Sequence, residues 1–120
     1  MTGTIREMQL MLPVVFVLSD GSEVTREIVI DTGFTGGLSL PMKMIEELGF
    51  PFFRALGAEL ADGITNEYPV YLATMRWHDK PLEVVTYALG DRPLLGTALL
   101  EGSRLNADFI ETASFTLEKN

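Results

Sequence analysis

One carboxylate in this chain stands directly after a run of β-branched residues. Residues 28–30 read Ile-Val-Ile and lead into Asp31, Thr32 and Gly33, with a second glycine at Gly36. Branched side chains pack well on a pleated sheet, so the run predicts a buried strand, and the glycines allow tight bends after it. A carboxylate at the end of a buried strand is costly unless it is hydrogen-bonded or shares a proton, so such a placement usually has a reason and makes Asp31 a candidate functional residue.

A second motif, Leu94-Leu95-Gly96, follows much later in the chain. An apolar pair before Asp-Thr-Gly, followed at this distance by apolar-apolar-Gly, resembles the retropepsin-like aspartic proteases. The resemblance covers residues 10–110 and is closer to the single-domain microbial members than to the viral enzymes. It implies a single domain over residues 1–120, folded mainly as β-structure into a small closed acid-protease-like barrel with one short helix and a flap hairpin.

The resemblance also implies hydrolysis of peptide bonds by a water molecule held between two carboxylates. Two such groups about 3 Å apart cannot both ionise cheaply, so they share a proton, and one acts as base while the other acts as acid. The chain supplies one aspartate of this kind, because Asp20 and Asp62 precede glycines but follow no apolar strand. The second carboxylate is therefore expected from Asp31 of another copy, which predicts a two-fold symmetric homodimer.

Neighbouring residues take their roles from the same resemblance. Thr32 is expected to hydrogen-bond across the two-fold axis, and the hairpin at residues 60–64 to close as a flap over an extended polypeptide substrate. The predicted catalytic residues are Asp31, Thr32 and Gly33; the predicted substrate-binding residues are Phe34, Thr35, Ala61, Asp62, Gly63 and Ile64; and Leu94, Leu95 and Gly96 are predicted to support the site from beneath.

Three positions depart from the viral pattern. Viral members usually pair an acidic residue after Asp-Thr-Gly with an arginine after the later glycine, whereas this chain has Thr35 and Thr97 there. Phe34 is large where a small residue is common, which favours narrow specificity or weak activity. Two readings stay open: a homodimeric aspartic endopeptidase, or a dimeric β-barrel that binds proteins without hydrolysing them, in which Asp31 caps a loop. The hairpin at residues 60–64 is either a working flap or a plain solvent-facing turn.

Alternation of apolar and polar residues places these motifs on short strands. A hairpin of residues 14–18 and 23–30 delivers the chain to Asp31, and further strands are expected at 38–40, 68–77, 82–89, 105–109 and 114–117. A helix is expected from Pro41, as its first residue, to Leu48, with Gly49 ending it, and a shorter one at 97–101. Residues 50–56 carry a proline and are interpreted as a packed connection. About eight strands result, which favours a closed or nearly closed barrel.

Composition excludes several other classes of protein. The 120 residues carry a net charge of −8, which argues against nucleic acid or an anionic membrane surface as a partner. The chain has no cysteine and one histidine, His78, so neither a thiolate site nor a multi-histidine metal site can form within one copy. No metal and no cofactor are expected. The apolar residues 10–18 lack the basic flank and cleavage site of a signal peptide, so we expect a buried strand there and a cytoplasmic location.

Overall fold

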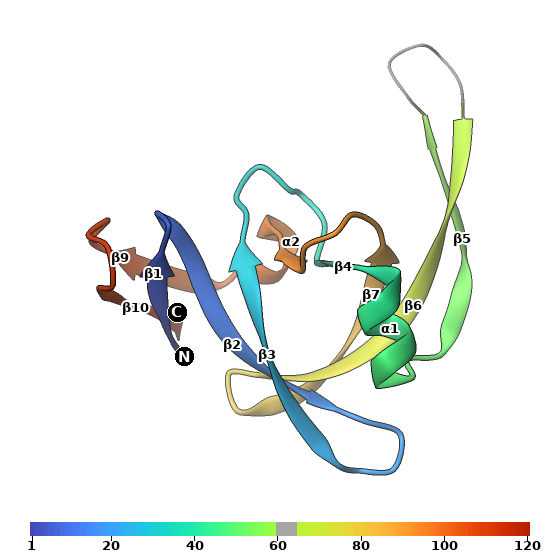
Figure 1. Ribbon diagram of the computed structural model, residues 1–120, viewed down its shortest axis with the longest axis horizontal. Coiled ribbons are helices and arrows are strands. Elements are labelled where there is room, and N and C mark those ends of the chain that lie inside the picture. Colours follow the sequence, from blue (N-terminus) through green and yellow to red (C-terminus); the bar gives the residue numbers. More distant parts are fainter. Residues whose placement is uncertain (60–64) are drawn as a thin grey trace.

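The computed structural model describes residues 1–59 and 65–120, in which β-strands predominate. The elements follow in chain order as β1 (Thr2–Arg6), β2 (Gln9–Val17), β3 (Glu23–Ile30), β4 (Leu38–Leu40), α1 (Met42–Leu48), β5 (Phe52–Glu59), β6 (Thr65–Trp77), β7 (Lys80–Ala88), β8 (Leu94–Leu95), α2 (Thr97–Leu100), β9 (Ser103–Ala107) and β10 (Ser114–Lys119). Figure 1 shows their arrangement around a central ring.

The ring closes at β2, which pairs within it with both β3 and β6. It pairs with β3 along its whole length and with β6 near its end, where Phe16 faces Met75. The sheet order then runs β6-β7-β4-β8-β3-β2 and returns to β6. This closure confirms the barrel that the sequence predicts.

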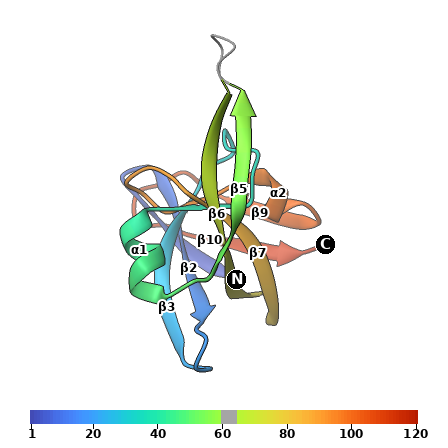
Figure 2. The ribbon, with the colours of Figure 1, turned by 90° about the vertical axis from the view of Figure 1, so that its right-hand side faces the viewer.

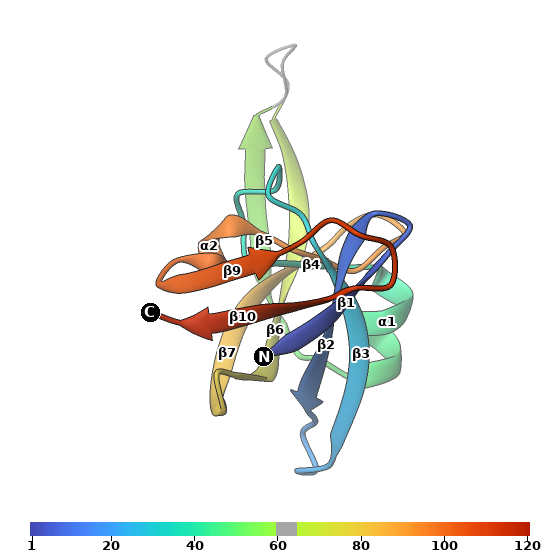
Figure 3. The ribbon, with the colours of Figure 1, turned by 90° about the vertical axis from the view of Figure 1, so that its left-hand side faces the viewer.

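The strands near the two ends of the chain extend the sheet beyond the ring. β1 pairs with β2 and with β10, and β10 pairs with β9, all antiparallel (Figure 3). The sequence does not predict β1, since its apolar residues are few. The tight turn between β1 and β2 places Glu7 and Met8 at positive φ, 51° and 56°, although neither is a glycine.

The prediction that residues 50–56 form a packed connection is wrong, because β5 occupies most of this segment. β5 pairs antiparallel with β6 and stands out beside the ring (Figure 2). Pro51 lies before the strand, where its ring blocks no ladder bond, and its carbonyl accepts the amide of Leu72 at 2.9 Å. A register shift between Phe52 and Arg54 disturbs the alternation by which such a strand is recognised.

The two helices are short. Pro41 is the cap before α1 rather than its first residue, with ψ 143°, and Gly49 ends the helix at φ 70° as predicted. α1 buries Ile45 and Leu48 against the barrel. None of the helices formed by the described residues has the length and apolar character needed to cross a lipid bilayer.

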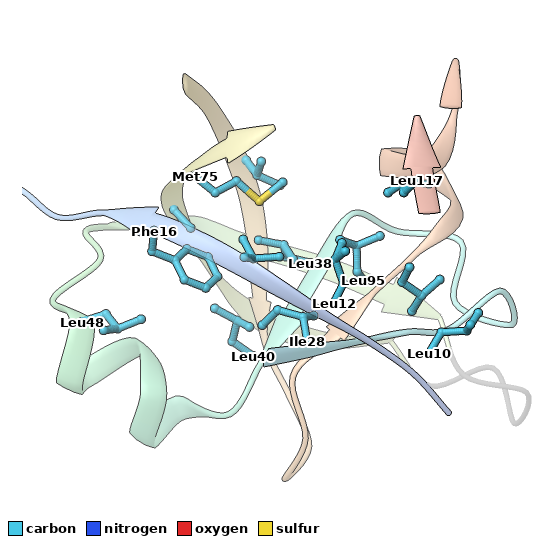
Figure 4. Close-up of a cluster of buried hydrophobic side chains, with 14 of the residues drawn as sticks. Leu10, Leu12, Phe16, Ile28, Leu38, Leu40, Leu48, Met75, Leu95 and Leu117 are labelled. Carbon is cyan, nitrogen blue, oxygen red and sulfur yellow. The ribbon is translucent and has the colours of Figure 1, made fainter. Parts of the chain in front are cut away.

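The core fills the ring and the space beneath α1. Figure 4 shows side chains from several strands and from α1 converging there. Phe16 and Phe50 pack with ring centroids 5.5 Å apart, whereas Phe52 and Phe53 are 60% and 45% exposed and lie outside the core. The labelled core residues are Leu10, Leu12, Phe16, Ile28, Leu38, Leu40, Leu48, Met75, Leu95 and Leu117.

Candidate active site

Asp31 follows the buried end of β3. Ile28, Val29 and Ile30 are 0%, 8% and 5% exposed, as the branched run predicts, and Asp31 itself is half-buried. β8 runs parallel to this end of β3, with Val29 opposite Leu94. The amide of Asp31 donates to the carbonyl of Leu95 at 2.9 Å, so the ladder continues one residue beyond β3. The backbone at Asp31 is therefore held by the sheet.

The carboxylate is oriented by its own loop. The Oδ1 atom of Asp31 accepts a hydrogen bond from the amide of Gly33 at 2.9 Å, and the backbone carbonyl of Asp31 accepts one from the amide of Phe34 at 3.1 Å. This Asx-turn orients the carboxylate relative to the backbone. Thr32 and Gly33 are exposed beside it. The loop thus presents the three predicted catalytic residues together at the surface end of β3.

Backbone hydrogen bonds fasten the loop to the segment that begins at Gly96. The amide of Gly96 donates to Gly37 at 2.8 Å, the amide of Thr97 to Phe34 at 2.8 Å, and the amide of Ala98 to Gly36 at 3.2 Å. A Cβ on Gly96 would lie 2.5 Å from the carbonyl oxygen of Phe34 and closer still to that of Gly36. Only glycine allows this approach of the two backbones. Leu95 and Gly96 therefore lie against the Asp31 loop, and Leu94 pairs with Val29 just before it. That these three residues support the site stays a prediction.

Phe34 and Thr35 differ in their exposure to solvent. The Phe34 ring meets Tyr87 edge to face, with centroids 6.4 Å apart, and is half-buried. Thr35 is exposed. Thr97 donates its hydroxyl to the carbonyl of Phe34 at 3.5 Å, in addition to its amide. Thr97 therefore binds the loop through its backbone and its hydroxyl rather than through a charge.

Two cavities meet at Asp31. One, of about 540 Å³, is lined by Asp31 and Thr32 together with Gln9, Arg92 and Phe109 among others. The second, of about 380 Å³, lies on the side of Phe34 and Leu89 and is also lined by Asp31, Asp91 and Arg92. Neither Gln9 nor Arg92 was predicted from the sequence as a site residue. The available signal was a charged pair, Asp91 and Arg92, immediately before Pro93 and Leu94.

The remaining predicted substrate-binding residues, Ala61, Asp62, Gly63 and Ile64, lie outside the described residues. The arms that lead to them are described: β5 pairs with β6 from Phe52 to Glu59. Among residues 1–59 and 65–120, no group of three His, Asp or Glu side chains is placed to hold a metal ion.

Groups with shifted pKa values lie away from Asp31. The Ser22 hydroxyl and amide, both hydrogen-bonded to Asp20, lower the pKa of that exposed carboxyl. Burial lowers the pKa of His78, and the positive charges of the amino terminus and Lys119 add to the effect. The His78 Nε2 atom lies 2.8 Å from the Ser103 hydroxyl. His78 lines neither cavity at Asp31.

The arrangement offers one oriented carboxylate between two cavities. Such a group can take a proton from water or give one to a substrate, but a single carboxylate cannot do both in one step. Acid and base catalysis together therefore need a second group opposite Asp31.

Comparison with known proteins concerns the fold. No protein-family model and no curated protein matches the chain. A retropepsin-like aspartic protease from Rickettsia conorii is 15% identical, with a TM-score of 0.53, and the alignment covers 98% of this chain and 88% of that one. The protease of EIAV, solved with an inhibitor, is 14% identical over 76% of this chain and 86% of its own, with a TM-score of 0.49. The chain has a retropepsin-like fold.

Proposed function

Because the fold is retropepsin-like, we propose that the chain is a homodimeric aspartic endopeptidase whose two Asp31 carboxylates, one from each copy, hold the attacking water. The observation that carries the proposal is the position of Asp31. It stands at the end of a buried strand, half-buried and backbone-fastened, where two cavities meet.

The chemistry follows from two carboxylates that share one proton. The ionised carboxylate removes a proton from the water as its oxygen attacks the carbonyl carbon of an extended polypeptide, and the protonated one donates to the carbonyl oxygen. Collapse of the tetrahedral intermediate then breaks the C–N bond, and a proton passes to the leaving amine. Thr32 and Gly33, exposed beside Asp31, are proposed to contact the partner loop and the substrate backbone.

Asp91 is the other carboxylate in the cavities at Asp31. It is exposed in the turn between β7 and β8, next to Gly90 at φ 73°. Asp31 of a second copy suits the reaction better, since two-fold symmetry gives both carboxylates the same backbone support and equal access to one water.

An exposed apolar surface beside Asp31 supports pairing of two copies. Phe109 and Ile110, between β9 and β10, are 60% and 65% exposed, and Phe109 lines the same cavity as Asp31. Their segment is well fastened: Thr112 donates to the Ile5 carbonyl at 2.9 Å, and Glu111 accepts the Glu7 amide at 2.8 Å. Ordered, exposed apolar side chains of this kind mark interaction surfaces.

Cleavage of an unfolded polypeptide across about pH 4 to 7 tests the proposal, since a shared-proton dyad works in that range. We expect Asp31→Asn to lower the rate by roughly 10³-fold, because it removes the general acid and base. Asp20→Asn is the matched control, since Asp20 also begins an Asp-Gly turn, and it should cleave at the wild-type rate. Cleavage that persists in Asp31→Asn would contradict the proposal.

Mixing the two forms tests whether the site is shared. When one part of wild type exchanges subunits with nine parts of Asp31→Asn, few dimers carry two aspartates, and activity should fall roughly tenfold below that of the wild type diluted alone. Unchanged activity in the mixture would assign catalysis to a single copy. Asp91→Asn then decides whether the second acid is Asp91.

A further inference from the structure

Arg92 stands beside Asp31 in both cavities. It is the cationic residue among those lining the larger cavity, and Asp31 is the anionic one. It also lines the smaller cavity, where Asp91 adds a second negative charge. A polypeptide that approaches Asp31 through the larger cavity therefore meets one guanidinium, that of Arg92, and no carboxylate other than Asp31 on the walls of this cavity.

The guanidinium is positioned by a neutral partner, Gln9. Its Nη2 donates to the Gln9 Oε1 at 2.6 Å, which links the turn before β8 to the start of β2. Among the described residues, ion pairs join Arg6 to Glu27 and Arg76 to Glu23, and Arg92 forms none with Asp31. Since arginine has five N–H donors, the bond to Gln9 leaves a planar fork for a ligand.

The negative charge around Asp31 gives the guanidinium of Arg92 an effect on which substrates can bind. The chain carries a net charge of −8, and Asp31 is itself an anion at the site, so an acidic substrate side chain would be repelled without a local cation. Guanidinium groups bind carboxylates through two parallel hydrogen bonds, which lysine or an amide cannot reproduce. Apolar residues of the same cavity, among them Leu10 and Leu94, suit the methylene groups of such a side chain.

We propose that Arg92 is a specificity-determining residue that selects peptides with a glutamate or aspartate next to the scissile bond. The inference rests on the proposed function, because it concerns the substrate of that same site. Since each copy of a homodimer supplies one Arg92, a two-fold site has one guanidinium on each side of the dyad. Acidic residues are then favoured on both sides of the cleaved bond.

The experiment compares peptides that differ only by glutamate or glutamine beside the scissile bond. For the wild type we expect kcat/KM to be about tenfold higher for the glutamate peptide, as for a charge-assisted hydrogen bond at a partly exposed site. Arg92→Gln should reduce this ratio to near one, and Arg92→Glu should favour a lysine peptide instead. Gln9→Ala, which removes the positioning contact, should lower the ratio in part.

Arg104→Gln is the matched control, because Arg104 is exposed on β9 and the substitution changes the net charge by the same amount. It should keep the wild-type ratio. Equal cleavage of both peptides by the wild type, or a preference that survives Arg92→Gln, would overturn the inference while the peptidase assignment stands.

Binding separates the inference from the proposed function. The Asp31→Asn protein should bind the glutamate peptide about tenfold more tightly than the glutamine peptide, by fluorescence polarisation, with the preference lost when Arg92→Gln is added. If the wild type cleaves neither peptide but this binding preference is found, Arg92 still selects acidic peptides as ligands, whereas the proposed peptidase function fails. Equal affinities overturn the inference.

Discussion

Asp20 and Asp31 begin turns with the same local chemistry. Each carboxylate accepts the amide two residues later at 2.9 Å, from Ser22 and from Gly33. The Asp20 turn closes on itself, with the Gly21 amide bound to the Leu18 carbonyl at 2.9 Å. The Asp31 loop is instead bound by a distant segment, and Thr97 lies 63 positions from Phe34.

The difference shows what separates a turn from a candidate site. A turn held by its own residues moves as a unit and offers its carboxylate to solvent. A loop held from both sides by remote backbone keeps its carboxylate in one position, as a preorganised site requires. Substitutions in and around the two turns test this contrast.

Replacing one glycine by alanine in each region should give the largest difference in the free energy of unfolding. Gly96→Ala should lower the free energy of unfolding by about 3 kcal/mol, because its Cβ would press on the carbonyls of Phe34 and Gly36. Gly21→Ala should cost about 1 kcal/mol, from the positive φ alone. Urea denaturation measures both. Equal losses would mean that the close approach at Gly96 does not constrain the Asp31 loop.

Pairing of copies should involve the Asp31 end of the molecule. Replacing Phe109 and Ile110 by serine should raise the dissociation constant of the dimer about 30-fold, the loss expected when four interface side chains, two from each copy, contribute about 0.5 kcal/mol each. Phe52 and Phe53, which are also exposed apolar side chains but lie on β5, provide the control when replaced by serine. Analytical ultracentrifugation measures the constant. Dimers that weaken only in the control would place the partner elsewhere.

The Thr97 hydroxyl should contribute little compared with its amide. Thr97→Val removes the 3.5 Å hydroxyl contact to Phe34 and keeps the 2.8 Å amide bond, so we expect a loss of about 0.5 kcal/mol. Hydrogen exchange of the Thr97 amide provides the measurement. A loss as large as that of Gly96→Ala would show that the hydroxyl, rather than the backbone, holds the loop.

The smallest effect concerns the Asp20 turn. The Ser22 hydroxyl, 2.6 Å from Asp20, is the main cause of the lowered pKa of that carboxyl, so Ser22→Ala should raise the pKa toward its ordinary value of 3.8. A carboxyl whose pKa is lower in the folded chain than in the unfolded chain stabilises the fold at pH values above its unfolded-state pKa. This stabilisation is lost as the pH falls through the folded-state pKa. The variant should therefore lose less stability on acidification. NMR titration of Asp20 measures this pKa. An unchanged pKa in Ser22→Ala would contradict the claim that the Ser22 hydroxyl lowers the pKa of Asp20.

Much of the fold could be read from local patterns. The hairpin of β2 and β3, the short helix before Gly49 and the strand of β-branched residues before Asp31 were all predictable, because alternation and turn residues act over a few positions. β5 was not, since its bulge at residues 52–54 breaks the alternation. Its pairing with β6 decides its conformation.

The candidate site divides in the same way. Asp31, Thr32 and Gly33 were identified from their motif, whereas Gln9 and Arg92 are 83 positions apart and were not. No local pattern records a contact of that length. A cavity also has no sequence signal, because it forms where elements from several parts of the chain meet.

The positions of turns, of alternating strands and of necessary glycines follow from the amino-acid sequence, because these properties depend on near neighbours. That Asp31, and not Asp20, is held by a distant segment follows from the three-dimensional fold instead. Closure of the ring brings β8 and Gly96 against the loop after β3, and the resulting backbone bonds orient a carboxylate between two cavities.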